Sequence, residues 1–175
     1  TTLFRSKPEE KNKFSHGIIV VDTQVKVVGY QGGELYVERW TRAIDRECKR
    51  RGWRYLFDPP HLADVDIALA LRDQTGYAPR HWKSGVKLAN AQGSGTPVIC
   101  TRERGYIETA CGAERWADSP AELALAFDEL EGHAARAEAS ERLFLAAPQL
   151  RDVAATLMEW LPTCKTLRKS SSIRP

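Results

Sequence analysis

Two lysines enclose a short glycine-containing segment, Lys83-Ser84-Gly85-Val86-Lys87. Small and apolar helix formers follow it, and Gly95-Thr96-Pro97 then interrupts the helical pattern just before an apolar run, Val98-Ile99-Cys100. This order predicts a loop, a helix, a turn and a strand. The first N–H groups of a helix lack intrahelical partners and lie at the positive end of the helix dipole. A helix that starts near Gly85 and carries Lys87 could therefore hold a phosphate group.

The same stretch resembles the C-terminal, donor-binding domain of two-domain GT-B glycosyltransferases. The likeness lies in Lys-x-x-x-Lys-Leu-Ala-Asn-Ala at residues 83–91 and in Gly-x-Gly-Thr-Pro-Val-Ile at residues 93–99. In that superfamily a comparable loop and helix grip the diphosphate of a sugar nucleotide. The resemblance implies that Lys87 and the helix start near Gly85, together with Lys83 and Gly32-Gly33, neutralise the diphosphate as its bond to the sugar breaks, with no metal or other cofactor. Ser84 is expected to bind the substrate beside them.

Two further positions enter through the resemblance. Many members of the superfamily bind the nucleotide ribose with a Glu where this chain has Asn90, and they carry another acidic residue eight positions earlier, where this chain has Trp82. Asn90 is expected to hold a ribose or sugar hydroxyl. Glu108 follows a glycine-containing loop and is expected at a helix start, where it either bonds such a hydroxyl or complements the helix dipole. No catalytic residue can be assigned.

The elements that would position these residues alternate along the chain. A β-branched run over residues 25–30 feeds a glycine turn and then a helical pattern over residues 34–51, as in the first unit of a doubly wound sheet. Further apolar runs predict strands at 53–57, 67–71, 98–100 and 113–116. Gly52 is expected to end the helix over 34–51, and Ser119-Pro120 supplies a cap residue and a first helical position for a helix that runs to about residue 130. We therefore predict an α/β, Rossmann-like three-layer domain with a mostly parallel sheet. Two helices within residues 133–161 are expected to cover it.

Two loops of this frame are candidates for ligand contact. Gly32 and Gly33 in the turn after the first strand could let the backbone approach a ligand, although ordinary turn formation explains them equally well. Arg72, Asp73 and residues 74–83 are expected at the carboxyl edge of the sheet. In this segment Tyr77, His81 and Trp82 either stack on a base or orient a sugar hydroxyl, or pack within the loop.

The length of 175 residues suits one domain. We expect a polar arm over residues 1–13, the Rossmann-like domain over 14–163 and a basic tail over 164–175. A two-lobed glycosyltransferase needs a second domain, so the resemblance implies one lobe, alone or cut from a longer chain. The acceptor side would come from an N-terminal lobe, a partner protein or a second copy in a homodimer.

Composition narrows the class of protein further. The net charge of +3 is too small to indicate nucleic acid as the main partner, and the basic cluster at residues 49–51 is better explained as compensation of a helix end. The four cysteines have no metal-binding spacing and are expected to be reduced and buried. No run is long and apolar enough to cross a membrane, and a cytoplasmic location is expected. The sequence also lacks a P-loop, a serine-hydrolase motif and a nicotinamide fingerprint.

The sequence thus predicts the donor-binding half of a glycosyltransferase that binds a nucleotide diphosphate sugar. One alternative is a module that binds a nucleotide or sugar without catalysis. Another is an enzyme that glycosylates modified DNA bases, in which residues 49–51 and the tail would follow phosphates. The sugar, the nucleotide and the acceptor stay open.

Overall fold

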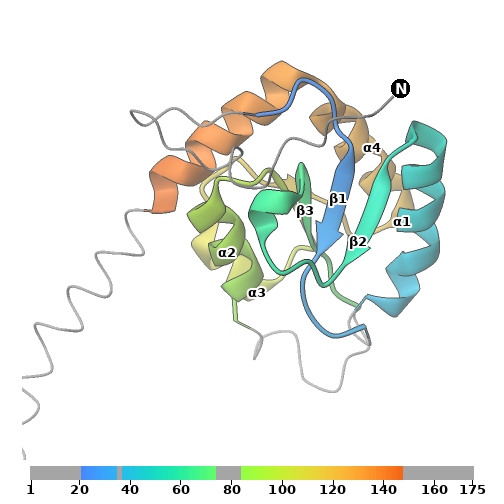
Figure 1. Cartoon of the computed structure of the whole chain (residues 1–175). Coiled ribbons are helices and arrows are strands. Elements are labelled where there is room, and N and C mark those ends of the chain that lie inside the picture. The colour runs from blue at the N-terminus through green and yellow to red at the C-terminus, as the bar shows by residue number, and fades with distance from the viewer. Residues whose placement is uncertain (1–20, 35–36, 74–83, 148–175) are drawn as a thin grey trace, which may run out of the picture.

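The computed structural model describes residues 21–34, 37–73 and 84–147. Its centre is one five-stranded sheet in which every neighbouring pair is parallel, in the order β2-β1-β3-β4-β5 (Figure 1). The strands are β1 (Val27–Tyr30), β2 (Arg54–Phe57), β3 (Ile67–Ala70), β4 (Val98–Cys100) and β5 (Arg115–Trp116). The chain runs outward from β1 to β2 and then crosses to β3, so the strand order reverses between β1 and β3. Ligands of open α/β sheets bind at such a reversal, beyond the carboxyl ends of the strands.

Helices cover both faces of the sheet (Figure 1). They are α1 (Glu38–Arg51), the 3-10 helix η3 (Leu62–Asp64), α2 (Val86–Ser94), α3 (Arg104–Thr109), α4 (Pro120–Glu131) and a further helix over residues 133–147. The α1 and α4 helices pack on one face, and η3, α2 and α3 pack on the other. Alternate strand residues supply the two cores: Ile67 and Leu69 face α1 and α4, whereas Ala68 and Ala70 face α2 and α3. The predicted three-layer α/β fold is confirmed.

The helix over residues 133–147 crosses the amino ends of the strands. Arg136 donates from Nη2 to the carbonyl of Asp22, at 2.7 Å, before β1. Ser140 donates to the carbonyl of Gly95 before β4, and Arg142 contacts the loop before β5. This helix therefore closes the edge of the sheet opposite to the carboxyl edge. It matches the first of the two predicted covering helices, and the second lies beyond residue 147, outside the described residues.

Local signals placed several boundaries correctly. Gly52 ends α1 with φ +70°, and the hydroxyl of Ser119 accepts from the N–H of Glu122 at the start of α4.

Two local expectations were wrong. The α3 helix begins at Arg104, because the carbonyl of Glu103 accepts its first backbone bonds, so Glu108 lies in the second turn and not at the start. Cys111 follows α3 in a loop and is half-buried.

Candidate functional site

Lys87 reaches from the first turn of α2 to the loop after β1. Its Nζ lies 3.7 Å from the centroid of the Tyr30 ring. A Cβ added to Gly32 would lie 3.0 Å from the same nitrogen, and Gly32 has φ +126°, a conformation that other residues rarely adopt. The structure therefore brings together the glycine loop and the helix start, two segments that the sequence separately indicated as ligand contacts.

The glycine loop is tied to the loop after β2. The N–H of Gly32 donates to Oδ1 of Asp58 at 3.1 Å, and Nε2 of Gln31 donates to the carbonyl of Pro59 at 3.0 Å. The hydroxyl of Tyr30 donates to the carbonyl of Gly33 at 3.4 Å. These bonds fix the turn at residues 30–33, beside which the side chain of Lys87 lies. They also place one carboxylate, that of Asp58, beside the loop.

The start of α2 has the polar groups that an anion needs. Its N-cap residue, Gly85, makes no side-chain cap bond, and the carbonyl of Gly85 accepts from the N–H of Ala89 at 3.0 Å. The N–H groups of residues 86–88 precede this first intrahelical bond. They lie at the positive end of the helix dipole, in the same turn as Lys87. Backbone and side chain thus supply positive charge at one place on the carboxyl edge.

Gly85 itself has a packing role that the sequence did not indicate. A Cβ at this position would lie 2.6 Å from the carbonyl oxygen of Gly105 and 2.9 Å from Oγ1 of Thr109, both in α3. Glycine therefore lets the start of α2 pack directly on the backbone of α3.

A pocket of about 450 Å³ runs along α2 next to this site. Its lining includes Gln31 from the glycine loop, His61 from the segment before η3, and Asn90 from α2. Asn90 lies three residues after Lys87, so the two side chains are neighbours on the helix surface. The structure places the predicted hydroxyl ligand, Asn90, in a cavity that adjoins the predicted phosphate ligand.

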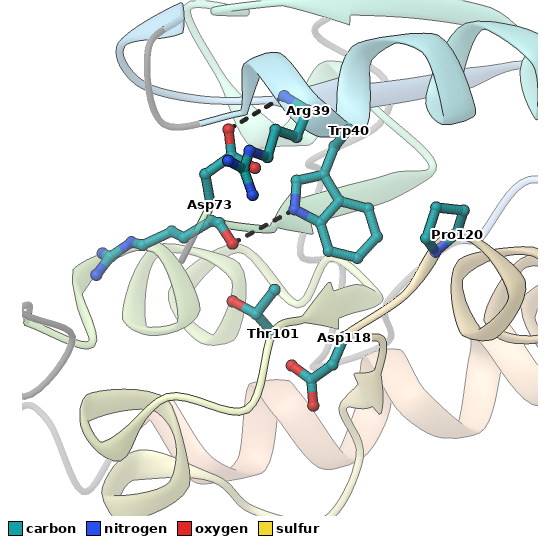
Figure 2. A pocket seen from close by; sticks show the side chains of 7 residues that line it. Arg39, Trp40, Asp73, Thr101, Asp118 and Pro120 are labelled. Carbon is teal, nitrogen blue, oxygen red and sulfur yellow. Dashed lines mark hydrogen bonds between the residues drawn. The ribbon is translucent and has the colours of Figure 1, made fainter. Parts of the chain in front are cut away.

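A second pocket, of about 230 Å³, lies on the α1 and α4 side of the carboxyl edge (Figure 2). Its polar groups hold the surrounding elements. Oδ2 of Asp73 accepts from the N–H of Arg39 at 3.1 Å and so caps α1, and Nε1 of Trp40 donates to the carbonyl of Arg72 at 3.3 Å. The carboxylate of Asp118 accepts two bonds from Arg102, at 2.9 and 3.0 Å. We attribute these groups to the scaffold.

Other predicted site residues are placed differently. Oε1 of Glu108 lies 2.6 Å from Nε of Arg104 in an exposed ion pair on α3, and a role for Glu108 in binding a hydroxyl stays a prediction. Ser84 is exposed before α2. Lys83 lies outside the described residues, as do the aromatic residues predicted to stack on a ligand. The sequence did not single out Glu103, a buried acid that follows β4 and forms an ion pair with Arg72.

A tyrosine hydroxyl and a cysteine thiol, both buried near the carboxyl ends of the strands, are protonated at neutral pH. Burial raises the pKa of the Tyr106 hydroxyl and of the Cys100 thiol well above their ordinary values. Neither group is therefore available as a base or a thiolate nucleophile at neutral pH.

The basic cluster in the last turn of α1, residues 49–51, is engaged in structural contacts. Lys49 pairs with Asp45 at 2.7 Å, whereas Arg51, whose side chain is only 3% exposed, bonds Asp128 and Glu131 of α4. These contacts favour the helix-end explanation of the cluster over a track for nucleic-acid phosphates.

Within the described ranges, no group of three or more His, Cys, Asp or Glu residues is arranged to hold a metal ion. Over the same ranges, no helix has the length and apolar character that crossing a membrane requires.

No protein-family model matches the sequence, and no curated protein matches it. Among solved structures, the chain is similar to Anabaena Alr3699/HepE, whose crystal structure is a complex with UDP and glucose. The two are 14% identical with a TM-score of 0.49, over 78% of this chain and 49% of that one. The chain thus spans about half the length of that structure.

Proposed function

We propose that this chain binds a nucleotide diphosphate sugar at its carboxyl edge, as the donor-binding half of a glycosyltransferase. The observation that carries the proposal is the position of Lys87. Its ammonium group lies against the glycine loop after β1, in the first turn of a helix without a side-chain cap, at the reversal of strand order.

The diphosphate would lie at the start of α2, between the N–H groups of residues 86–88 and the ammonium of Lys87. Negative charge grows on the diphosphate as the bond to the sugar breaks, and fixed positive groups at that place stabilise the transition state. The ring of Tyr30, whose centroid lies 3.7 Å from Nζ, holds the ammonium of Lys87 beside the glycine loop.

The nucleoside would occupy the neighbouring pocket of about 450 Å³, with Asn90 as a partner for a ribose hydroxyl. An amide both donates and accepts hydrogen bonds, so Asn90 can bind a hydroxyl as a carboxylate would, without adding negative charge near the diphosphate. Gln31 joins the two parts of this site, because it lines the pocket and precedes Gly32, where an added Cβ would meet the side chain of Lys87.

Transfer also needs an acceptor hydroxyl in line with the anomeric carbon and a base within hydrogen-bond reach. We propose that a second lobe, a partner protein or a second copy supplies these. Residues 1–175 by themselves should then bind the donor yet transfer or hydrolyse it slowly or not at all. Robust transfer by a proven monomer of this chain would overturn the half-enzyme proposal, and donor binding without turnover under all conditions would favour the non-catalytic module.

The deciding experiment is a thermal-shift screen of nucleosides, nucleoside diphosphates and sugar nucleotides. A ligand that binds only the folded state raises the melting temperature by mass action, and at 100 times its Kd it adds about 2.7 kcal/mol of stability. We expect a shift with UDP or another nucleoside diphosphate, and a smaller shift with the matching nucleoside. The absence of any shift at millimolar ligand would overturn the proposal.

A further inference from the structure

We propose that Arg72 is a positioning residue that fixes the start of α2, and that Glu103 holds Arg72 in the required orientation. The inference rests on the proposed function, because the start of α2 is the proposed diphosphate site. Arg72 would not contact the ligand. It would set where the N–H groups of residues 86–88 point.

The guanidinium of Arg72 connects three elements. Its Nη2 donates to the carbonyl of Ser84 at 3.0 Å, one residue before the N-cap of α2. Its Nη1 donates to Oε2 of Glu103 at 2.9 Å, at the carboxyl end of β4. The group also lies 4.9 Å from the centroid of the Tyr106 ring in α3. Two hydrogen bonds thus fix the planar guanidinium within its plane, and the Tyr106 ring packs on one of its faces.

Glu103 is itself fixed. Its Oε1 accepts from Oγ1 of Thr101 at 3.3 Å, and its side chain is only 1% exposed, against 8% for Arg72. The charge of Arg72 is therefore balanced by a buried carboxylate at close range. With its charge compensated inside the fold, Arg72 is suited to a role in geometry.

The backbone of Arg72 is anchored on the opposite face of the sheet. Trp40 in α1 donates to its carbonyl, and Asp73, the next residue, accepts from the N–H of Arg39 (Figure 2). The end of β3 is thus fixed to α1, and the guanidinium transmits that fixed position through the sheet to Ser84. The position of the start of α2 is therefore fixed by the sheet and α1, and not only by the loop that precedes α2.

The chemistry of the pair favours positioning over stability. A buried ion pair loses hydration on both partners, and well-packed apolar residues often replace such pairs without loss of stability. What an apolar pair cannot do is donate a directed bond to the carbonyl of Ser84. Lysine cannot replace the arginine either, because an ammonium lacks the planar fork that serves Glu103 and Ser84 while stacking on Tyr106.

The test compares Arg72→Lys with Arg136→Lys. Arg136 is also a buried arginine that donates to carbonyl groups, but it lies at the amino edge, where it bonds Leu130 and Asp22. The affinities of each variant for UDP and for uridine, or for the diphosphate and nucleoside that the wild type prefers, are measured by calorimetry. For Arg72→Lys we expect the diphosphate affinity to fall about ten- to a hundredfold with little change for the nucleoside, as misplaced binding groups produce. Arg136→Lys should leave the ratio of the two affinities unchanged.

A second readout needs no ligand. Amide hydrogen exchange of Ala89, whose N–H makes the first intrahelical bond of α2, should accelerate in Arg72→Lys and not in Arg136→Lys. If the wild type binds no diphosphate, the proposed function fails, and this exchange measurement still decides whether Arg72 fixes α2. Equal changes in both variants, or none in Arg72→Lys, would overturn the inference.

Glu103→Gln provides a second variant if Arg72→Lys does not fold. The amide has nearly the same shape as the carboxylate, but it carries no charge and puts an NH2 donor in place of one acceptor oxygen. We expect the same selective loss of diphosphate affinity and of Ala89 protection. A folded Glu103→Gln protein with wild-type values of both would overturn the proposal.

Discussion

At the scale of single residues, Lys87 and Lys49 offer a matched comparison. Lys87→Ala should weaken nucleoside diphosphate binding by about ten- to a hundredfold, because a hydrogen bond to a charged group contributes roughly 1.5 to 3 kcal/mol. Lys49→Ala should change it little, since Lys49 is 75% exposed and pairs with Asp45 at the far end of α1. Calorimetric titration of both variants measures the difference. Equal losses would remove Lys87 from the binding site.

Gly85 allows a second test at this scale. Gly85→Ala should lower the free energy of unfolding by about 1 to 3 kcal/mol, the range for inserting a methyl group into a filled contact, because the new Cβ meets the backbone of Gly105 at 2.6 Å. Gly132→Ala is the control, since a Cβ there meets nothing within 4 Å. Urea unfolding of the two variants measures the contrast. A Gly85→Ala protein as stable as the wild type would show that α2 and α3 can separate at no cost.

At the scale of an element, α2 combines a helix with one wall of the larger pocket. Gly93 lines that pocket and has open space where a Cβ would lie. Gly93→Ala should therefore stabilise the protein by about 0.5 kcal/mol through helix propensity, and thermal unfolding measures this. Gly93→Leu should fold as well but fill part of the pocket and weaken binding of nucleosides and nucleoside diphosphates alike. If Gly93→Leu binds as the wild type does while Lys87→Ala does not, the nucleoside lies elsewhere.

At the scale of the whole molecule, the buried thiol of Cys48 makes global stability depend on alkaline pH. Burial, with a smaller effect from Asp45, raises its pKa from about 9 to about 11 in the folded protein. The unfolded chain therefore loses this proton first as pH rises, so the contribution to stability is complete below about pH 9 and is lost as pH approaches 11. Urea unfolding between pH 8 and about pH 9.5, below the ordinary pKa of tyrosine, should show a decline.

Cys48→Ala should reduce that decline. It should not abolish it, since burial also raises the pKa of Cys100. An unchanged dependence on pH in Cys48→Ala would show that this thiol does not titrate differently in the folded and unfolded states.

Much of the frame follows from signals within a few residues of each other. Apolar runs predicted the strands, Gly52 predicted the end of α1, and the Ser119-Pro120 pair predicted the start of α4. Hydrophobic periodicity and capping act over one or two turns, so a single sequence displays them directly. The same local logic placed Lys87 at the start of a helix on the carboxyl edge.

The contacts across the sheet were decided by the tertiary structure. Lys87 meets Gly32 across 55 positions of chain, Arg72 meets Glu103, and Gly85 packs on Gly105. Each contact depends on the order and register of the strands, which put the ends of β1, β3 and β4 side by side, and no spacing within one segment encodes that order. Glu108 shows the same limit in reverse: its helix begins one turn earlier than its neighbours suggested, and its carboxylate then lies beside Arg104. Residue types can indicate a helix whose first turn could bind a phosphate. Only the packing of α2 against β1, β3 and α3 determines which groups surround that first turn.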